Sequence, residues 1–444
     1  MRKIAILVLF TALLSSCGGS ESTSVAVVIP IPAGKSGVEP SVAQLLQKTG
    51  NELHLAMNDP QKWMMHGSAL FANAYYNEAV IAFTEAITIK PEMPQATYLL
   101  ATALWKVNKQ EKATQALQTS LGLIPEYDMG WRLLAEWQME RGETEQAESS
   151  ARRAFELNPG RIGTRYVLVQ SLMDGEKYEE ALPILEEVVS INKAPPWIYT
   201  LASQCYRQLG KTQQSEQALA KSGPPFVDWP DPMYKHIPNL IAGKAEIALY
   251  ALHLNRVNGS EKALPFLVKA NKINPEHIDV RVALSMAFQE KGNLDVAQKV
   301  LEELLGEANT NYWKQYAGLS IAQNDLDKAK EYVTKAIELN SEDANAQDIA
   351  AFIAKNQGNA AEAMKHWQEA ARLYVEVELW EKAELSLAYA SENGELSQDG
   401  LCALALAQIE LEHIAQARTT IQKILSLEPS NSKAVALQNR LPQE

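Results

Sequence analysis

Three consecutive stretches of 34 residues carry one pattern of small, large and proline positions: PQKWMMHGSALFANAYYNEAVIAFTEAITIKPEM at 60–93, PQATYLLATALWKVNKQEKATQALQTSLGLIPEY at 94–127, and DMGWRLLAEWQMERGETEQAESSARRAFELNPGR at 128–161. Pro91, Pro125 and Pro159 recur at this spacing. A fixed period with a constant order of residue types is the sequence signature of a repeat architecture, in which each unit contacts only its neighbours.

The spacing inside one stretch predicts a pair of helices. Trp63, Gly67 and Leu70 are separated by three or four residues, so they share one face of a first helix. Phe83 occupies the facing row of a second helix, and the small Gly67 allows that helix to cross closely. Pro91 ends the second helix, because proline has no backbone donor and clashes with the preceding turn. One pair cannot bury both faces, whereas stacked pairs can.

Written as W-x2-[HLV]-[GA]…A-x3-[FLA]-x2-[AS]-x4-P, the pattern resembles the tetratricopeptide repeat (TPR). The resemblance implies an all-α fold, a TPR superhelical solenoid of about ten helix-turn-helix repeats with a concave groove. We place five repeats in an N-terminal block, 41–222, which begins with a leading helix, and five in a C-terminal block, 244–444, with an additional helix near 377–391. The repeats lie near 60–93, 94–127, 128–161, 162–195, 196–222, 244–277, 278–309, 310–343, 344–377 and 398–431.

Residues 223–243 interrupt the period with a proline-rich insert, which begins Gly-Pro-Pro-Phe-Val-Asp-Trp-Pro-Asp-Pro-Met-Tyr. Closely spaced prolines favour an extended path. We expect proteases to cut near Pro224 to Lys235 and to leave two helical fragments. The alternative is that the segment from Phe226 to Tyr234 folds back into the groove, which would protect it.

The N-terminus resembles that of a bacterial lipoprotein. Residues 1–16 have a short positive start and an apolar stretch too short to span a bilayer, which is typical of a signal peptide. Leu14-Ser15-Ser16-Cys17 is similar to a lipoprotein box, which implies that Cys17 carries lipid, including palmitate. The alternative is an ordinary signal peptide with a chance cysteine. Gly18 follows the cysteine where lipoproteins retained in the inner membrane carry aspartate, so the resemblance implies an outer-membrane anchor. Residues 17–40 are then a flexible tether.

Composition and motifs argue against catalysis and nucleic acid. The 444 residues have a formal net charge of −13, whereas binding a phosphate backbone needs a basic footprint. The sequence contains no HExxH, G-x-S-x-G or Gly-rich dinucleotide loop, so we expect no enzyme, cofactor or metal site. Cys205 and Cys402 lie in distant repeats and are interpreted as buried thiols without a disulfide. His66 is interpreted as a partly buried structural residue.

The family resemblance also assigns the groove. Its register places positions 2, 5, 9, 12 and 13 of each first helix on the concave face. The family's chaperone-binding members use a Lys/Asn carboxylate clamp, but its positions here hold Met64, Ser68, Tyr98 and Thr102, so that clamp is absent. Aromatic and arginine side chains dominate binding hot spots, and we expect the aromatics to line one continuous strip. The predicted groove residues are Met64, Phe71, Tyr98, Trp105, Arg132, Tyr166, Trp197 and Arg207.

Two functions follow as hypotheses. The first is a non-enzymatic periplasmic scaffold or adaptor, lipid-anchored in the bacterial outer membrane, that holds a protein or peptide partner in its groove during envelope assembly. By resemblance, such proteins serve pilus, secretion, polysaccharide or cell-wall machinery. The second is an accessory subunit of an envelope redox or other enzyme system. It rests on a resemblance of Trp229-Pro230-Asp231-Pro232 to segments of TPR proteins that neighbour multihaem cytochromes.

Overall fold

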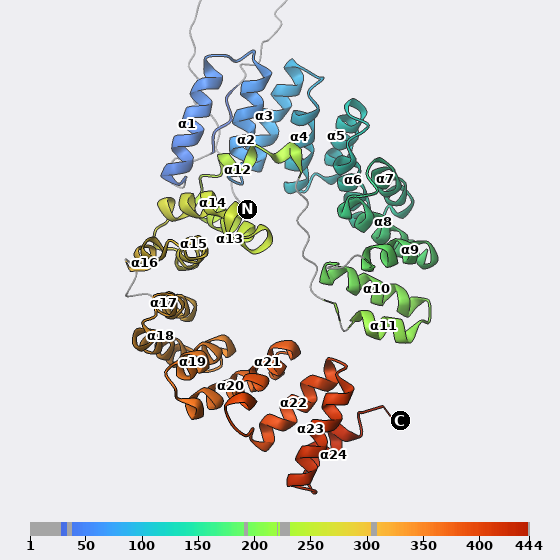
Figure 1. The fold of residues 1–444 in the computed structure, drawn as a ribbon. Helices are drawn as coiled ribbons and strands as arrows, with labels where there is room; N and C mark the ends of the chain where they lie inside the picture. The colour runs from blue at the N-terminus through green and yellow to red at the C-terminus, as the bar shows by residue number, and fades with distance from the viewer. Residues whose placement is uncertain are drawn as a thin grey trace, which may run out of the picture. The chain divides into compact units, whose positions relative to one another are not determined.

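The computed structural model describes residues 28–32, 38–190, 194–219, 221–222, 231–302 and 309–442. Within these ranges every regular element is a helix, which confirms the predicted all-α repeat fold (Figure 1). The chain divides into a first compact unit that ends at Ile247 and a second that begins at Ala248, so the division falls inside one helix.

The described residues of the first unit form a leading helix, five helix pairs, a short segment with two small helical turns, and the start of α13. The leading helix is α1 (Pro40–His54). The pairs are α2 (Pro60–Ala72) with α3 (Tyr76–Ile89), α4 (Pro94–Lys106) with α5 (Gln110–Leu123), α6 (Asp128–Glu140) with α7 (Thr144–Leu157), α8 (Ile162–Asp174) with α9 (Tyr178–Val189), and α10 (Pro196–Gln208) with α11 (Thr212–Leu219). The short turns are η2 (Pro232–Tyr234) and α12 (Ile237–Leu240).

The second unit continues the pairing. Its first helix, α13 (Lys244–Asn258), starts in the first unit and meets α14 (Ser260–Ile273) through an edge-to-face contact of Tyr250 with Phe266. The following helices are α15 (Ile278–Glu290), α16 (Leu294–Glu302), α17 (Thr310–Ala322), α18 (Leu326–Leu339), α19 (Ala344–Asn356), α20 (Ala360–Glu376), α21 (Trp380–Asn393), α22 (Gln398–Glu410), α23 (Ile414–Leu427) and α24 (Ser432–Gln438). The additional helix α21 packs beside α20, in the region where the repeat spacing lengthens.

Small residues set the distance between paired helices. Ala79 and Ala86 are completely buried in α3, and so is Phe83 between them. A Cβ built on Gly67 of α2 would lie 2.8 Å from two ring carbons of Phe83. No side chain fits there without movement, so the glycine and the phenylalanine are matched in size.

The fourth residue of several repeats ties that repeat to the loop before it. In each case a side-chain N–H donates to the backbone carbonyl six residues earlier, at or near the proline that ends the previous pair. These carbonyls follow the last turn of a helix and lack a helical partner of their own. The donors are Trp131 Nε1 to Pro125 at 2.8 Å, Arg165 Nε to Pro159 at 2.6 Å, Gln347 Nε2 to Ser341 at 3.2 Å, and Arg281 Nε to Pro275.

The turn inside a repeat needs one left-handed residue, and its place recurs with the period. Glycine is suited to this conformation because it has no Cβ, whereas other residues adopt it with strain. Only some repeats carry glycine there. The residues in the first unit are Ala74 with φ 64°, Asn108 with φ 59°, Gly142 with φ 73°, Glu176 with φ 58° and Gly210 with φ 71°.

The N-terminal segment Val28–Pro32 departs from the predicted tether. Pro30 is buried, and its carbonyl accepts a hydrogen bond of 2.8 Å from His66 Nε2. His66 Nδ1 accepts one of 2.8 Å from Thr49 Oγ1 on α1, so both ring nitrogens are satisfied. Burial lowers the pKa of His66, which is fully rather than partly buried. The tether prediction is therefore wrong for Pro30, whose carbonyl satisfies a buried imidazole, whereas Val28 and Ile31 are exposed. Residues 1–27, including Cys17, lie outside the described part.

Candidate functional site: a strap on the first helices

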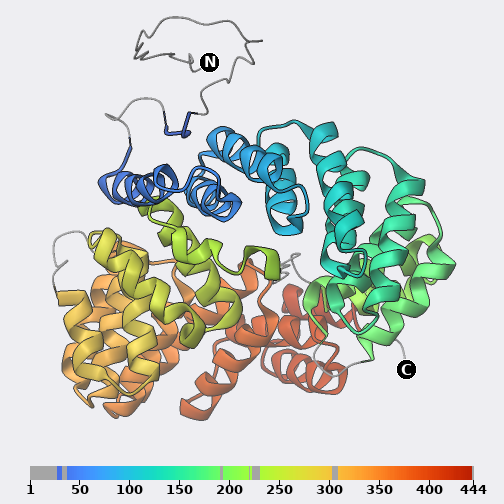
Figure 2. The same cartoon turned by 90° about the horizontal axis from the view of Figure 1, so that it is seen from above.

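The described part of the proline-rich insert, Asp231–Gly243, lies against the first helices of the N-terminal repeats. We call this segment the strap. It contains η2, which packs on α4, and α12, which packs on α2 (Figure 1). Figure 2 shows the same segment in yellow-green beside the blue helices of the first repeats. The fold-back alternative therefore holds for the described part of the insert.

Two tyrosine hydroxyls hold the carboxylate of Asp231. Tyr98 Oη donates to Asp231 Oδ2 at 2.6 Å, and Tyr127 Oη donates to Asp231 Oδ1. The carboxylate also accepts from the backbone N–H of Met233 at 2.9 Å, which caps η2. Burial, together with the neighbouring Asp231, raises the pKa of both tyrosines. The phenols therefore remain neutral donors, and the site binds a carboxylate through hydroxyl groups.

The ring of Tyr234 lies between two aromatic side chains of the repeats. Its centroid is 6.1 Å from that of Phe71 and 5.9 Å from that of Tyr98, with an interplanar angle of 71° to the latter. Tyr98 in turn meets Tyr127 edge to face at 5.9 Å. Edge-to-face and tilted pairs at these distances are favourable beyond the area they bury. Tyr98 itself is completely buried.

Polar side chains from α2 and α4 bind the middle of the strap. Gln95 Nε2 donates to the Met233 carbonyl at 3.0 Å and approaches His236 Nδ1 at 3.3 Å. Since Nδ1 accepts, Nε2 carries the ring proton and donates to Ser68 Oγ at 2.8 Å. Burial lowers the pKa of His236, which favours this neutral form.

Asn73, which follows α2, anchors the C-terminal end of the strap. Its Nδ2 donates to the carbonyls of Ala69 at 2.8 Å and Leu240 at 2.9 Å. Its Oδ1 accepts from the backbone N–H groups of Ala242 at 2.7 Å and Gly243 at 2.9 Å. The side chain is 4% exposed. One buried amide thus satisfies three backbone groups of the strap, which fixes its register.

Residues at the start of helix α1 also bind the C-terminal end of the strap. Ser41 Oγ donates to the Ala242 carbonyl at 2.8 Å, and Glu39 Oε2 accepts from the Lys244 N–H at 2.7 Å. After the fifth repeat, therefore, the chain returns to the first repeat before α13 begins.

Comparisons with known proteins match this architecture. The tetratricopeptide repeat family model matches residues 63–93 and 312–343. These two stretches of the chain match the tetratricopeptide repeat.

A search of solved structures finds several repeat proteins among the matches. The crystal structure of MamA is 16% identical, covers 37% of this chain and 89% of its own, and has a TM-score of 0.31. A tetratricopeptide repeat protein from Parabacteroides merdae ATCC 43184 is 14% identical, and the match covers 70% of this chain and 98% of that chain with a TM-score of 0.31. YrrB, described as a TPR protein with an unusual peptide-binding site, is 18% identical, with 47% and 98% covered and a TM-score of 0.26. No curated protein matches the sequence.

The groove residues that the TPR register predicted differ widely in exposure. Met64, Tyr98, Arg132 and Trp197 are buried, with exposed fractions of at most 7%. Tyr98 is covered by the strap, so this chain itself occupies that predicted position. Those left partly or fully exposed are Phe71, Trp105, Tyr166 and Arg207.

The predicted aromatics divide among separate ring contacts. Trp105 stacks on Trp137, with centroids 4.4 Å apart and planes 3° from parallel. Tyr166 meets Trp197 edge to face at 4.9 Å. Tyr98 belongs to the strap site described above.

Arg132 forms an ion pair with Glu136 one turn later on α6. Burial raises the pKa of Glu136, and this outweighs the opposing effect of the Arg132 guanidinium. The predicted groove therefore contains a half-buried acidic group beside its arginine.

Sequence reasoning missed most of the residues that hold the strap. Gln95 occupies position 2 of its TPR, so the family register could have found it. Asn73 and Tyr127 lie outside the register, at the ends of a helix and a repeat. Their partners are more than a hundred residues away, and no local signal indicates them.

The corresponding first helices of the second unit line a groove of about 800 Å³. Lys314 at its edge forms an ion pair of 2.7 Å with Asp343. Gln315 Nε2 donates to Gln289 Oε1 at 2.7 Å. Side-chain amides are frequent along this TPR face, namely Gln289, Asn311, Gln315 and Asn345.

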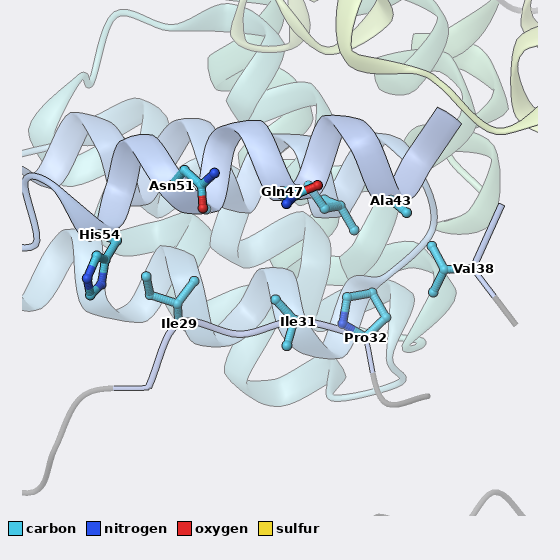
Figure 3. A pocket seen from close by; sticks show the side chains of 10 residues that line it. Ile29, Ile31, Pro32, Val38, Ala43, Gln47, Asn51 and His54 are labelled. Atoms are coloured by element: carbon cyan, nitrogen blue, oxygen red, sulfur yellow. The ribbon is translucent and has the colours of Figure 1, made fainter. Parts of the chain in front are cut away.

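A smaller hollow of about 520 Å³ lies between the segment Val28–Pro32 and α1. Ile29 and Ile31 line it from the segment, and Gln47, Asn51 and His54 line it from α1 (Figure 3). Over the described residues we find neither a cluster of metal-ligating side chains nor a helix long and apolar enough to cross a membrane.

Proposed function

We propose that this chain is a non-enzymatic scaffold, in which the first helices of the tetratricopeptide repeats hold an extended segment of a protein partner. We further propose that Cys17 is lipidated and anchors the chain in the bacterial outer membrane, facing the periplasm, where it serves envelope assembly. The scaffold proposal is supported by the repeat fold. The lipoprotein-like N-terminus supports the proposed localisation.

The strap is the observation that carries the scaffold proposal. It is a proline-containing segment that lies on the first helices of the repeats. It consists of turns and two short helical elements, η2 and α12, so the predicted extended path is wrong for its described residues. Side-chain amides bind its backbone, and tyrosines and a phenylalanine bind its side chains. A surface that binds one proline-containing segment in this way has the donors, acceptors and aromatic contacts that a segment of a partner needs.

We assign the partner to the first helices of repeats two to five, where Trp105, Tyr166 and Arg207 are left partly or fully exposed. Aromatic side chains provide large contact area at low entropy cost, so they dominate the binding energy of interfaces. The formal net charge of −13 favours a protein partner over nucleic acid.

The experiment is co-purification from envelope extracts with the full-length chain and with Trp105→Ala and Tyr166→Ala variants. We expect each substitution to weaken binding by about 1–4 kcal/mol, so that the partner no longer co-purifies. Phe155→Ala is the matched control, because it removes a partly buried aromatic from the second helix α7. Equal recovery of the partner by the two first-helix variants and the control would refute the assignment.

The address has its own test. Cys17→Ala should abolish labelling with a palmitate analogue and move the protein from the outer-membrane fraction to the soluble fraction. Continued outer-membrane fractionation of Cys17→Ala would show that another feature holds it there.

A further inference from the structure

We infer that the first helices of repeats one and two, with Tyr127, form a binding site for a segment that carries a carboxylate residue and, three positions later, an aromatic residue. The strap occupies this site in cis, and a partner segment of the same chemistry displaces its N-terminal half. This inference rests on the scaffold function proposed above and deepens it, because it names the segment that the scaffold binds.

The carboxylate position is defined by its donors. Two phenol hydroxyls, that of Tyr98 on α4 and that of Tyr127 just before α6, converge on the two oxygens of Asp231, and Met233 N–H supplies a third donor. Three donors around one group require an acceptor with several lone pairs, which a carboxylate has. An asparagine would present an NH₂ group to one of the two phenols, which would then have to accept, and the hydrogen bonds to a charged group would be lost, so the site favours the acid over its amide.

The aromatic position is defined by the slot beside it. Tyr234 follows Asp231 by three residues and places its ring against Phe71 and Tyr98. Gln95 binds the intervening backbone through the Met233 carbonyl, an interaction that any residue in that place can make. The site therefore specifies an acidic residue and an aromatic residue, and it leaves the two residues between them undefined.

The two halves of the strap are held differently. The C-terminal half buries Ile237, Ile241 and Ala242 and is fixed by Asn73. The N-terminal half, Asp231–His236, is held by individual hydrogen bonds and ring contacts, and Pro232 and Lys235 are exposed. Hydrogen bonds contribute little net free energy when water competes for the same groups. The N-terminal half can therefore leave while the C-terminal half stays docked.

A segment tethered in cis competes at a high effective concentration. A partner then binds only to the fraction of molecules with the site open, so its apparent affinity falls by that fraction. The strap thereby excludes segments that have only one of the two features. A partner segment that makes both the carboxylate and the aromatic contact compensates for the contacts that the strap loses when it is displaced.

The test uses the full chain and an acetylated, fluorescein-labelled peptide of residues 231–236 as the probe, followed by fluorescence anisotropy. We expect the chain with Asp231→Asn and Tyr234→Ala to bind this peptide at least tenfold more tightly than the unaltered chain. Adding Tyr98→Phe and Tyr127→Phe should remove that binding, and a peptide with Asp231→Asn should bind neither chain. Equal affinity of the altered and unaltered chains overturns the inference, and so does loss of helicity in the altered chain, because the strap is then part of the fold.

A second measurement needs no variant. Trypsin cleavage after Lys235 requires the N-terminal half of the strap to be open, so excess unlabelled peptide should accelerate cleavage of the unaltered chain. The Asp231→Asn peptide is the control. An unchanged cleavage rate overturns the inference. Because the probe is synthetic, this result is independent of whether Trp105→Ala and Tyr166→Ala lose the partner from extracts.

Discussion

The close approach of Gly67 and Phe83 allows a quantitative prediction. In Gly67→Ala the new methyl group would lie 2.8 Å from two ring carbons and 3.2 Å from the Cβ of Ala82. Alanine in place of glycine in a helix interior stabilises by about 1 kcal/mol. Overpacking a filled site costs roughly 1–3 kcal/mol, and we take the upper end because Phe83 is completely buried. The net expectation is a loss of about 2 kcal/mol.

The neighbouring repeat suggests the compensating change. The positions equivalent to Gly67 and Phe83 hold Ala101 and Leu117, both completely buried. Phe83→Leu should therefore make room for the added methyl group. We expect Phe83→Leu alone to destabilise by about 1–2 kcal/mol, since it leaves part of the ring volume empty. In the Phe83→Leu background, Gly67→Ala should be neutral or stabilising, which corresponds to a coupling free energy of about 2–3 kcal/mol.

The assay is native-state amide hydrogen exchange of α2 and α3 in the full chain, because global unfolding of a chain with two units does not report one repeat. A loss of 2 kcal/mol corresponds to roughly 30-fold faster exchange of the protected amides. Faster exchange should be confined to the first repeat and its neighbours. An equal cost of Gly67→Ala in both backgrounds would falsify the size-matching argument.

Four further outcomes are expected. Burial lowers the pKa of His66, so the folded state disfavours protonation of this side chain. The stability that neutral His66 contributes is present above pH 6.5 and is lost as the pH falls below that value. Acid should therefore lower the melting temperature of His66→Leu less than that of the unaltered chain. Asn73→Ala should leave buried backbone groups of the strap without a partner, which destabilises by about 1–3 kcal/mol for each group. The Ala242 amide should then lose its protection from exchange. Glu176 has a φ of 58°, which glycine adopts without strain, so Glu176→Gly should stabilise α8 and α9 by about 1 kcal/mol and slow their amide exchange. Faster exchange would contradict the strain argument. Burial raises the pKa of the Cys205 thiol to about 11, so iodoacetamide at pH 8 should label it in urea and leave it unlabelled in the native chain.

The repeat fold could be predicted from the sequence because its determinants are local and periodic. The proline that closes a repeat, such as Pro91, prevents the second helix from continuing, and alternating small and large residues specify which helices pair closely. These rules act within one repeat and the next. The all-α fold therefore follows from positions such as Gly67, Phe83 and Pro91 without knowledge of the rest of the chain. The same reasoning placed Trp63 correctly in the core.

The strap site was beyond sequence reasoning for a physical reason. The composition of residues 223–243 predicts an extended path, but it does not say which surface that path follows. The binding surface exists only after the repeats have stacked, since it combines Asn73, Gln95 and Tyr127 from three separate places in the chain. The family register identified Tyr98 as a surface contact, whereas its hydroxyl is buried against Asp231. Periodicity determined the helices and their order; only the tertiary structure determined that the chain fills part of its own binding face, because that depends on hydrogen bonds between residues far apart in sequence.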